Sequence, residues 1–381
     1  MKDVFVTYNN IISALGFNTT SNIEQISKGI SGIKKQEDKK LMKNPFYASL
    51  IDTYELDKAF KKFGNGKIYT RLEKMMILSL HDVIQQSKIT ITKKTALIIS
   101  TTKGNVDTLD SKSEFPKERA YLPELGKQIQ HFFGFENEAI IVSNACVSGI
   151  LSIAIAKRLI QSEVYEDVLI VSGDVVSEFI LSGFNSFQAI SEKPCKPFSK
   201  NRTGITIGEA AATVLVTANK KYKSDDAVKV VGDSSCNDAN HISGPSRTGE
   251  GLYRSMLAAF SEAKIEPSSV DYISAHGTAT QFNDEMEAIA LNRMQLNNTP
   301  LNSLKGYYGH TLGASGLVET IVGMQSLYYN TLYASLGFDE LGVTENINVI
   351  KKNESKELKT FLKTASGFGG CNTAVIFQKA M

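Results

Sequence analysis

The sequence contains no run of about eighteen apolar residues, the length that a membrane-spanning helix needs. Its first residues include no apolar core long enough for a signal peptide. The four cysteines, Cys146, Cys195, Cys236 and Cys371, form no close pair and show no metal-ligand spacing. These absences argue against a membrane protein and against a disulfide scaffold. They predict a cytoplasmic protein whose thiols stay reduced.

The sequence also lacks a strong excess of one charge. Its 42 Lys and Arg residues and 40 Asp and Glu residues give a net charge of +2, which suggests neither nucleic acid nor a membrane surface as a partner. A Walker-type phosphate loop and low-complexity tracts are absent as well. With 381 residues, 42% of them hydrophobic, the chain is long enough for two or three domains with an ample core.

Short apolar runs typical of buried strands alternate with amphipathic segments of helical length. The predicted strands are 3–8, 95–101, 138–143, 167–172, 210–216, 228–231, 270–275 and 373–378. The predicted helices are 72–86, 149–161, 251–263, 283–294 and 312–329. This alternation predicts an α/β fold in layers around a covered, mostly parallel sheet.

Two polar segments bear on the domain organisation. Residues 219–226 are polar and charged without periodicity, so we expect them to link two halves, 1–218 and 227–381. Residues 34–67 are rich in lysine and irregular in pattern, and we expect them to lie on the surface.

Cys146 lies where an apolar run gives way to a helical pattern. Ser148 and Gly149 permit a tight turn that would expose the sulfur. Unpaired amide groups at a helix start favour thiolate over thiol. A cysteine so placed can take an acyl group from a thioester, with its own N–H as one oxyanion donor. The alternative is a small buried hydrophobic residue, which is how we interpret the other three cysteines.

His276 and His310 both lie in turns of small residues, Ala-His-Gly-Thr and Gly-His-Thr-Leu-Gly-Ala-Ser-Gly. If both rings point into one cavity, each can donate an N–H to the same thioester carbonyl and stabilise an enolate. Two separate structural histidines are the alternative reading. Zinc held by one cysteine and two histidines is a weaker option, because no two of these ligands lie close together on one element.

Glu319 lies inside an apolar helical run, where a buried carboxylate needs a partner. Lys305, five residues before His310, is the predicted partner, and the pair would hold positive charge beside the chemistry. Alternatively both side chains face solvent. Asp284 and Glu287 are predicted to cap the helix on which they lie.

Residues 366–370 place three glycines around Phe368, between two apolar strands. The turn is either a plain hairpin or a movable gate that also offers backbone N–H groups, at Phe368 and Gly369, to an oxyanion. Basic residues that could form a docking surface are Arg71, Lys74, Lys196, Lys200 and Arg202.

Taken together, these motifs resemble those of the β-ketoacyl-acyl-carrier-protein synthases, in the Cys-His-His branch of the thiolase-like condensing enzymes. The shared motifs are Asn-Ala-Cys-Val-Ser-Gly, Lys-Pro-Phe-Ser-Lys-Asn-Arg-Thr-Gly with Gly-Glu-Ala, Ala-His-Gly-Thr-Ala-Thr, Asn-Ser-Leu-Lys, Gly-His-Thr-Leu-Gly-Ala-Ser-Gly and Gly-Phe-Gly-Gly-Cys-Asn. They occur in the family's order. The similarity is dense from about residue 140 onward and looser before.

The resemblance implies a five-layer α-β-α-β-α fold of two similar halves, working as a dimer with the site near the interface. Substrates would arrive on the phosphopantetheine arm of an acyl carrier protein, with no metal or other cofactor. The carrier, an acidic protein, would dock on a basic rim. The dimer would be a homodimer, or a heterodimer with a related ketosynthase-like subunit.

The resemblance also implies roles for single residues. Cys146 would be acylated, and His276 and His310 would bind the malonyl thioester and promote its decarboxylation. Lys305 would support His310, with Glu319 as its counter-ion.

Around the entrance, Phe368 with Gly369 would form the gate and part of the oxyanion hole. Thr278 and Thr280 would hydrogen-bond the pantetheine arm.

Several residues depart from the family pattern, and the chain is shorter than most members. The departures are Val147, Ala210, Asn283 and Cys371. They imply a divergent member, in polyketide or polyene synthesis rather than housekeeping fatty-acid elongation. Alternatives are a coenzyme A thiolase, which would need a second catalytic cysteine, and a non-catalytic chain-length subunit, which usually lacks the nucleophile.

Overall fold

The computed structural model describes residues 2–239, 242 and 244–380. Ten strands form one sheet in the order β11-β10-β14-β15-β9-β1-β8-β6-β4-β5. Their bounds are β1 Phe5–Ser13, β4 Thr95–Ser100, β5 Ile140–Val142, β6 Asp167–Asp174, β8 Ala210–Thr217, β9 Val228–Asn237, β10 Tyr272–Ser274, β11 Leu301–Asn302, β14 Thr360–Gly367 and β15 Cys371–Lys379. The two halves of the sheet meet where β1 pairs briefly with β9.

The strand order repeats between the halves. The first half runs β5-β4-β6-β8-β1 from its edge inward, and the second runs β11-β10-β14-β15-β9. Numbered along the chain within each half, both read 3-2-4-5-1. The directions repeat too, since the first two neighbouring pairs from each edge are parallel and the third pair is antiparallel. The two halves are therefore similar, as predicted.

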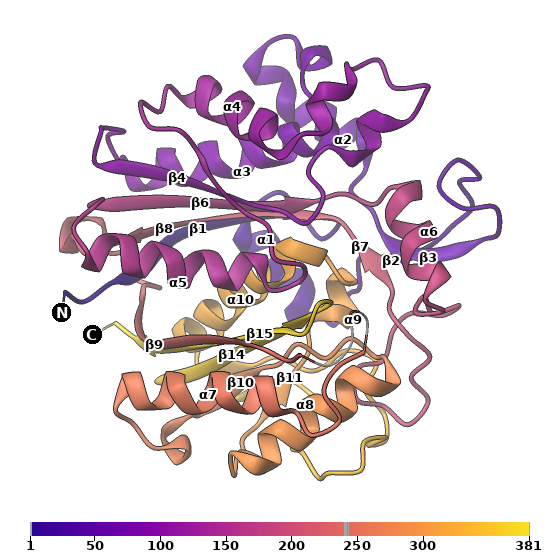
Figure 1. Ribbon diagram of the computed structural model, residues 1–381, viewed down its shortest axis with the longest axis vertical. Coiled ribbons are helices and arrows are strands. Elements are labelled where there is room, and N and C mark those ends of the chain that lie inside the picture. The colour runs from indigo at the N-terminus through magenta and orange to yellow at the C-terminus, as the bar shows by residue number, and fades with distance from the viewer. Residues whose placement is uncertain (1, 240–241, 243, 381) are drawn as a thin grey trace.

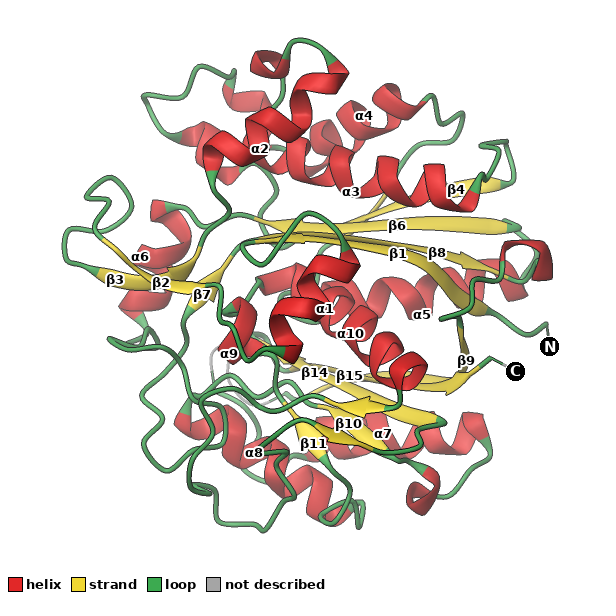
Figure 2. Ribbon diagram, turned by 180° about the vertical axis from the view of Figure 1, so that it is seen from behind, coloured by secondary structure: helices red, strands yellow, loops and turns green. Residues whose placement is uncertain are grey.

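Three pairs of helices complete the layers. Their bounds are α3 Arg71–Ser87, α4 Leu122–Phe133, α5 Ser148–Gln161, α7 Glu250–Ala263, α8 Gln281–Arg293 and α10 Ser315–Tyr329. Figure 1 shows α3 and α4 over the outer face of the first half-sheet and α7 and α8 over the outer face of the second, with α5 and α10 between the two. The same sandwich is seen from behind in Figure 2. The predicted five-layer α/β architecture is confirmed. The prediction of a mostly parallel sheet is wrong, because five of the nine neighbouring pairs in the large sheet are antiparallel.

The central layer depends on close approach of α5 and α10. A side-chain Cβ at Gly149 would lie 2.7 Å from the Gly313 carbonyl oxygen, and one at Gly316 would lie 2.6 Å from the Ile150 nitrogen. Glycine at both positions lets the helix backbones touch. The contact sets the starts of α5 and α10 side by side, and these starts follow the sequence motifs of Cys146 and His310.

Residues 34–67 lie largely on the surface, as expected from the sequence. Their irregular sequence pattern nevertheless hides regular elements: β2 (Ile33–Gln36), β3 (Phe46–Ser49) and α2 (Thr53–Phe60). The strands form a second sheet with β7 (Ile207–Gly208), which comes much later in the chain. Such a distant pairing leaves no local pattern in the lysine-rich sequence.

The remaining elements are short. They are α1 Thr19–Ser27, α6 Glu178–Ser186, α9 Lys305–Tyr308, β12 Thr331–Leu332 and β13 Glu354–Ser355. Among the described residues, no helix has the length and apolarity needed to cross a bilayer. The division between residues 218 and 227 stays a prediction, placed between the end of β8 and the start of β9.

Candidate active site

Cys146 follows a strained turn at the end of β5. Ala145 adopts a positive φ of 44°, which is uncommon for a residue with a side chain. The Ser148 hydroxyl holds this turn by accepting from the Asn144 N–H at 2.7 Å and donating to the Ala145 carbonyl at 2.6 Å. The sulfur therefore lies just before α5, as the sequence predicts. The prediction that the turn exposes it is wrong, since only 8% of the residue's surface is exposed.

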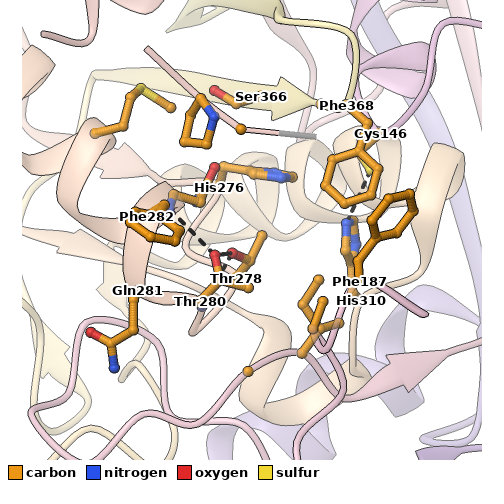
Figure 3. A pocket seen from close by; sticks show the side chains of 18 of the residues that line it. Cys146, Phe187, His276, Thr278, Thr280, Gln281, Phe282, His310, Ser366 and Phe368 are labelled. Atoms are coloured by element: carbon orange, nitrogen blue, oxygen red, sulfur yellow. Dashed lines mark hydrogen bonds between the residues drawn. The ribbon is translucent and has the colours of Figure 1, made fainter. Parts of the chain in front are cut away.

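The sulfur faces a cavity of about 530 Å³. Six of the predicted site residues line it: Cys146, His276, Thr278, Thr280, His310 and Phe368. Figure 3 shows them around one chamber, and the hydroxyls of Thr278 and Thr280 lie 2.9 Å apart. The structure therefore brings together side chains from both halves of the chain.

Cys146 and His310 are in direct contact. The His310 Nε2 atom lies 3.2 Å from the Cys146 Sγ atom, and its Nδ1 atom lies 3.0 Å from the Ser315 hydroxyl. Burial raises the pKa of the Cys146 thiol to about 12, although the Lys305 ammonium lowers it. Burial, helped by the same ammonium, holds the pKa of His310 well below 6.5. A neutral thiol therefore faces a neutral imidazole, and burial outweighs the predicted stabilisation of thiolate at the helix start.

The ring of His276 stands beside that of His310, with ring centres 5.3 Å apart and planes at 81°. The Lys305 Nζ atom donates to the His276 carbonyl at 2.5 Å and lies 3.5 Å from its Nδ1 atom. Because an ammonium can only donate, we assign the Nδ1 atom as an acceptor and the hydrogen to Nε2, which leaves a donor for the chamber. Burial, followed by the charge of Lys305, lowers the pKa of His276 well below 6.5.

The predicted ion pair of Lys305 and Glu319 is present at 2.8 Å, with both side chains at most 3% exposed. Lys305 contacts His276, however, rather than His310 as the resemblance implied. Ser303, two residues before Lys305, donates to the Gly277 carbonyl at 2.6 Å, and this contact holds the start of α9 beside the His276 peptide. A second ammonium, that of Lys363, also binds Glu319 at 2.7 Å.

Asp284 and Glu287 do not cap their helix. Thr280 does so by accepting from the Asn283 N–H. Asp284 accepts from the Thr278 N–H at 2.9 Å, and Glu287 accepts from the N–H of His276 at 2.8 Å. Both carboxylates lie on the buried face of α8 and hold the loop that carries the histidine.

The glycine turn joins β14 to β15 as a hairpin. The Phe368 ring, 37% exposed, packs against the rings of Phe184 and Phe187, with centres 5.6 and 5.4 Å away. The Gly369 N–H donates to the Ile242 carbonyl at 2.7 Å. This N–H is therefore occupied, and the prediction of Gly369 as an oxyanion donor is wrong for this conformation.

Two of the predicted docking residues bind partners inside the protein. Arg202, 4% exposed, donates to the Gly342 carbonyl at 2.6 Å, so a surface role for it is wrong. Arg71 is only partly exposed, with 24% of its side chain accessible, and it pairs with the buried Glu209. A sequence pattern cannot distinguish a surface guanidinium from one whose partner lies far along the chain.

The three lysines of the predicted docking set are each paired with a carboxylate. Lys74 pairs with Asp57 at 2.7 Å, Lys196 with Asp339 at 2.9 Å and Lys200 with Glu340 at 3.0 Å. Only Lys196 and Lys200 expose much of their side chains, and their partners neutralise them locally.

Two cysteines interpreted as packing residues are buried near the site. Cys195 donates its thiol hydrogen to the Lys305 carbonyl at 3.3 Å, and Cys371 donates to the Phe368 carbonyl at 3.2 Å.

The sequence analysis did not identify Ser315 and Lys363 as residues of the site. Lys363 carried a usable signal, since it interrupts the apolar run of β14 just as Glu319 interrupts that of α10.

Comparisons with known proteins identify the family. The family model described as "Beta-ketoacyl synthase, N-terminal domain" matches residues 2–221. The model described as "Beta-ketoacyl synthase, C-terminal domain" matches residues 228–339. The chain belongs to the β-ketoacyl synthase family. The resemblance found in the motifs is thereby confirmed.

Individual relatives of the chain carry names that agree with this family assignment. The 3-oxoacyl-acyl-carrier-protein synthase 2 of Rhizobium meliloti is 31% identical over 267 residues, 66% of this chain and 62% of that protein. The corresponding synthase of Staphylococcus aureus (strain COL) is 24% identical over 412 residues, 99% of this chain and 98% of that protein. The matches to the first two curated relatives span less than two thirds of those proteins, 64% and 62%.

A solved structure shares the fold. A ketosynthase in complex with its chain length factor, from Xenorhabdus doucetiae, superposes with a TM-score of 0.86 at 24% identity, covering 100% of this chain and 98% of that one. The fold predicted from the sequence is therefore that of the ketosynthases.

Proposed function

We propose that the chain is a β-ketoacyl-acyl-carrier-protein synthase that condenses an acyl group with a malonyl group and releases carbon dioxide. The observation that carries the proposal is the 3.2 Å contact between the Cys146 sulfur and the His310 Nε2 atom, with the His276 ring in the same chamber. A thiol, its base and a second N–H donor are the groups that this chemistry needs.

In the first half-reaction the Cys146 thiol gives its proton to His310 Nε2 as the sulfur attacks the thioester carbonyl. The Ser315 hydroxyl accepts the Nδ1–H and so favours the tautomer with a free Nε2 lone pair. Backbone N–H groups of Cys146 and Phe368 are the proposed oxyanion donors. The intermediate then expels the carrier's thiolate, which takes the proton back from His310.

In the second half-reaction the malonyl thioester oxygen accepts N–H groups from His276 and His310. Loss of carbon dioxide leaves an enolate, which these donors stabilise. Its carbon attacks the acyl carbon on Cys146, and the released thiolate takes a proton from solvent. His310 must now donate at Nε2, and a hydroxyl partner permits this because Ser315 can donate to Nδ1 as well as accept from it.

The proposed partner is an acyl carrier protein, whose pantetheine arm would pass Thr278 and Thr280, which line the chamber. Of the predicted docking residues, the exposed Lys196 and Lys200 remain candidates. A homodimer, or a heterodimer like that of the Xenorhabdus ketosynthase with its chain length factor, remains a proposal, as do a cytoplasmic location and a role in polyketide or polyene synthesis.

The proposal is tested with acyl and malonyl carrier proteins and mass spectrometry of the products. Cys146→Ala should abolish condensation. Cys146→Gln should also abolish it but leave malonyl decarboxylation running, because both histidines remain. Condensation by either variant would reject the assignment, and an inactive wild-type chain that gains activity only with a second subunit would indicate an obligate heterodimer.

A further inference from the structure

Beneath His276 lies a buried cluster of charged side chains. Both Lys305 and Lys363 bind the Glu319 carboxylate, at 2.8 and 2.7 Å, and the three side chains are at most 3% exposed. The buried Glu287 carboxylate also acts on Lys363, so two ammonium groups share two carboxylates. Lys363 still needs oxygen atoms around its ammonium, since a buried charge without hydrogen-bond partners is strongly unfavourable.

Backbone carbonyls supply those oxygens at Lys363. Its Nζ atom donates to the carbonyls of Thr364 at 2.6 Å, Ser274 at 3.1 Å and Ala275 at 3.4 Å. Together with the Glu319 oxygen they form a cage of four oxygen atoms around one nitrogen. Rings of carbonyls, alone or with a carboxylate, are what proteins use to hold K⁺, and an ammonium ion is close to K⁺ in size.

The cage sits at a point that fixes the histidine loop. Ser274 ends β10, and Ala275 directly precedes His276. The strand that carries Lys363 pairs in parallel with β10, with Ser274 opposite Lys363. A charge held here therefore ties β10, β14 and α10 together directly below the His276 peptide.

We propose that Lys363 is a positioning residue whose ammonium acts as a covalently tethered monovalent cation, filling an oxygen cage that orients His276. The same charge disfavours protonation of both imidazoles, and it thereby helps keep them neutral for the chemistry proposed above. The activity readouts below rest on the proposed function, whereas the binding and stability readouts do not.

The first test uses Lys363→Ala, which removes the ammonium and leaves room for a free ion. Its melting temperature should fall in lithium or choline chloride and recover in potassium or ammonium chloride. Tetramethylammonium, which is too large, should not restore it. Crystals soaked in thallium or rubidium should show an anomalous peak among the four oxygens. Failure to fold in potassium, or a melting temperature independent of the cation, would overturn the proposal.

Two matched controls separate this effect from ordinary destabilisation. Lys363→Met keeps the side-chain volume and fills the space of the ion, so potassium should not restore the melting temperature of this variant. Lys157 is another buried lysine, 3% exposed, held by the carboxylates of Asp233 and Glu262. Lys157→Ala should lose stability without selective recovery in potassium. Equal recovery in either control would show general salt stabilisation instead.

The activity readout is malonyl decarboxylation. In Lys363→Ala we expect kcat to fall at least about tenfold in lithium chloride and to return within about threefold in potassium chloride, because small displacements of a catalytic group lower rates strongly. Loss of the ammonium should also move the acid limb of the pH profile to higher pH. Lys305 also lowers the pKa of both imidazoles. The other titratable groups around the two imidazoles are Glu319, Glu287 and Cys146.

The outcomes are distinguishable from failure of the proposed function. If the wild-type chain proves unable to decarboxylate malonyl carriers, the cation-dependent stability and the anomalous peak still decide whether Lys363 fills a cation cage. If decarboxylation is normal and independent of the cation in Lys363→Ala, the positioning role is rejected while the proposed function stands.

Discussion

The Nε2 atom of His310 lies 3.2 Å from the Sγ atom of Cys146, although 164 positions separate the two residues in the chain. Each residue precedes one helix of the central pair, and the helices touch through glycine. The contact between the proposed nucleophile and its proposed base therefore follows from the packing of these two helices, and the properties of both residues can be tested.

The buried thiol should react slowly at neutral pH. Because burial raises the pKa of Cys146 to about 12, we expect its alkylation by iodoacetamide to rise about tenfold per pH unit between about pH 8 and about pH 11. Peptide mass spectrometry would follow Cys146, with the more exposed Cys236 as an internal reference for reagent access. A rate that levels off near pH 9, the ordinary thiol pKa, would contradict the expectation.

Ser315→Ala should slow acylation of Cys146 by at least about tenfold, because His310 then loses the Nδ1 partner that sets its tautomer and ring orientation. Rapid-quench mass spectrometry of the acyl-enzyme measures this step. Ser152→Ala is the matched control, since that buried hydroxyl on α5 binds only the Ser148 carbonyl in the described contacts. Equal slowing in both variants would point to a packing effect.

Glu287→Ala should destabilise the fold by about 1–3 kcal/mol, because the N–H groups of His276 and Gly277 would lose their buried acceptor. Urea denaturation gives the free energy of unfolding. On the same helix, Glu285 is only partly buried and binds Thr344, so Glu285→Ala should change stability by no more than about 1 kcal/mol. A smaller loss for Glu287 than for Glu285 would contradict the assigned role.

Gly149→Ala should lower stability by about 1–3 kcal/mol, since its Cβ would meet the Gly313 oxygen and push α5 away from α10. Activity should fall with it, because Cys146 and His310 would separate. Gly183→Ala on α6 is the control: a Cβ there meets nothing within 4 Å, and alanine favours helix. Thermal unfolding and condensation rates of the two variants test this expectation, and equal losses in both would contradict it.

Local sequence patterns predicted most of the long helices and strands and the three side chains that meet in the chamber. Apolar runs identified most strands of both half-sheets, and turns of small residues identified His276 and His310. The partners of buried charges were harder to predict. The apolar surroundings of Glu319 in the sequence predicted that it binds a cation. They did not show that Lys305 contacts His276 or that Lys363 also binds Glu319.

Long-range contacts explain the other errors. Arg71 resembles a surface residue in the sequence because its partner, Glu209, lies 138 positions away. Asp284 and Glu287 have the spacing of helix-capping residues, yet their carboxylates accept from the loop that precedes the helix. Their roles depend on which face of α8 is buried, and α8 has a nearly uniform distribution of polar and apolar residues.

The order in which the chain is made bears on when its chemistry can begin. The thiol of Cys146 leaves the ribosome well before either imidazole, and the hairpin of Phe368 together with Lys363 comes near the end of this chain. If the proposed function holds, a nascent first half carries the acyl acceptor without its base. Turnover would then begin only when the last strands have closed the second half-sheet.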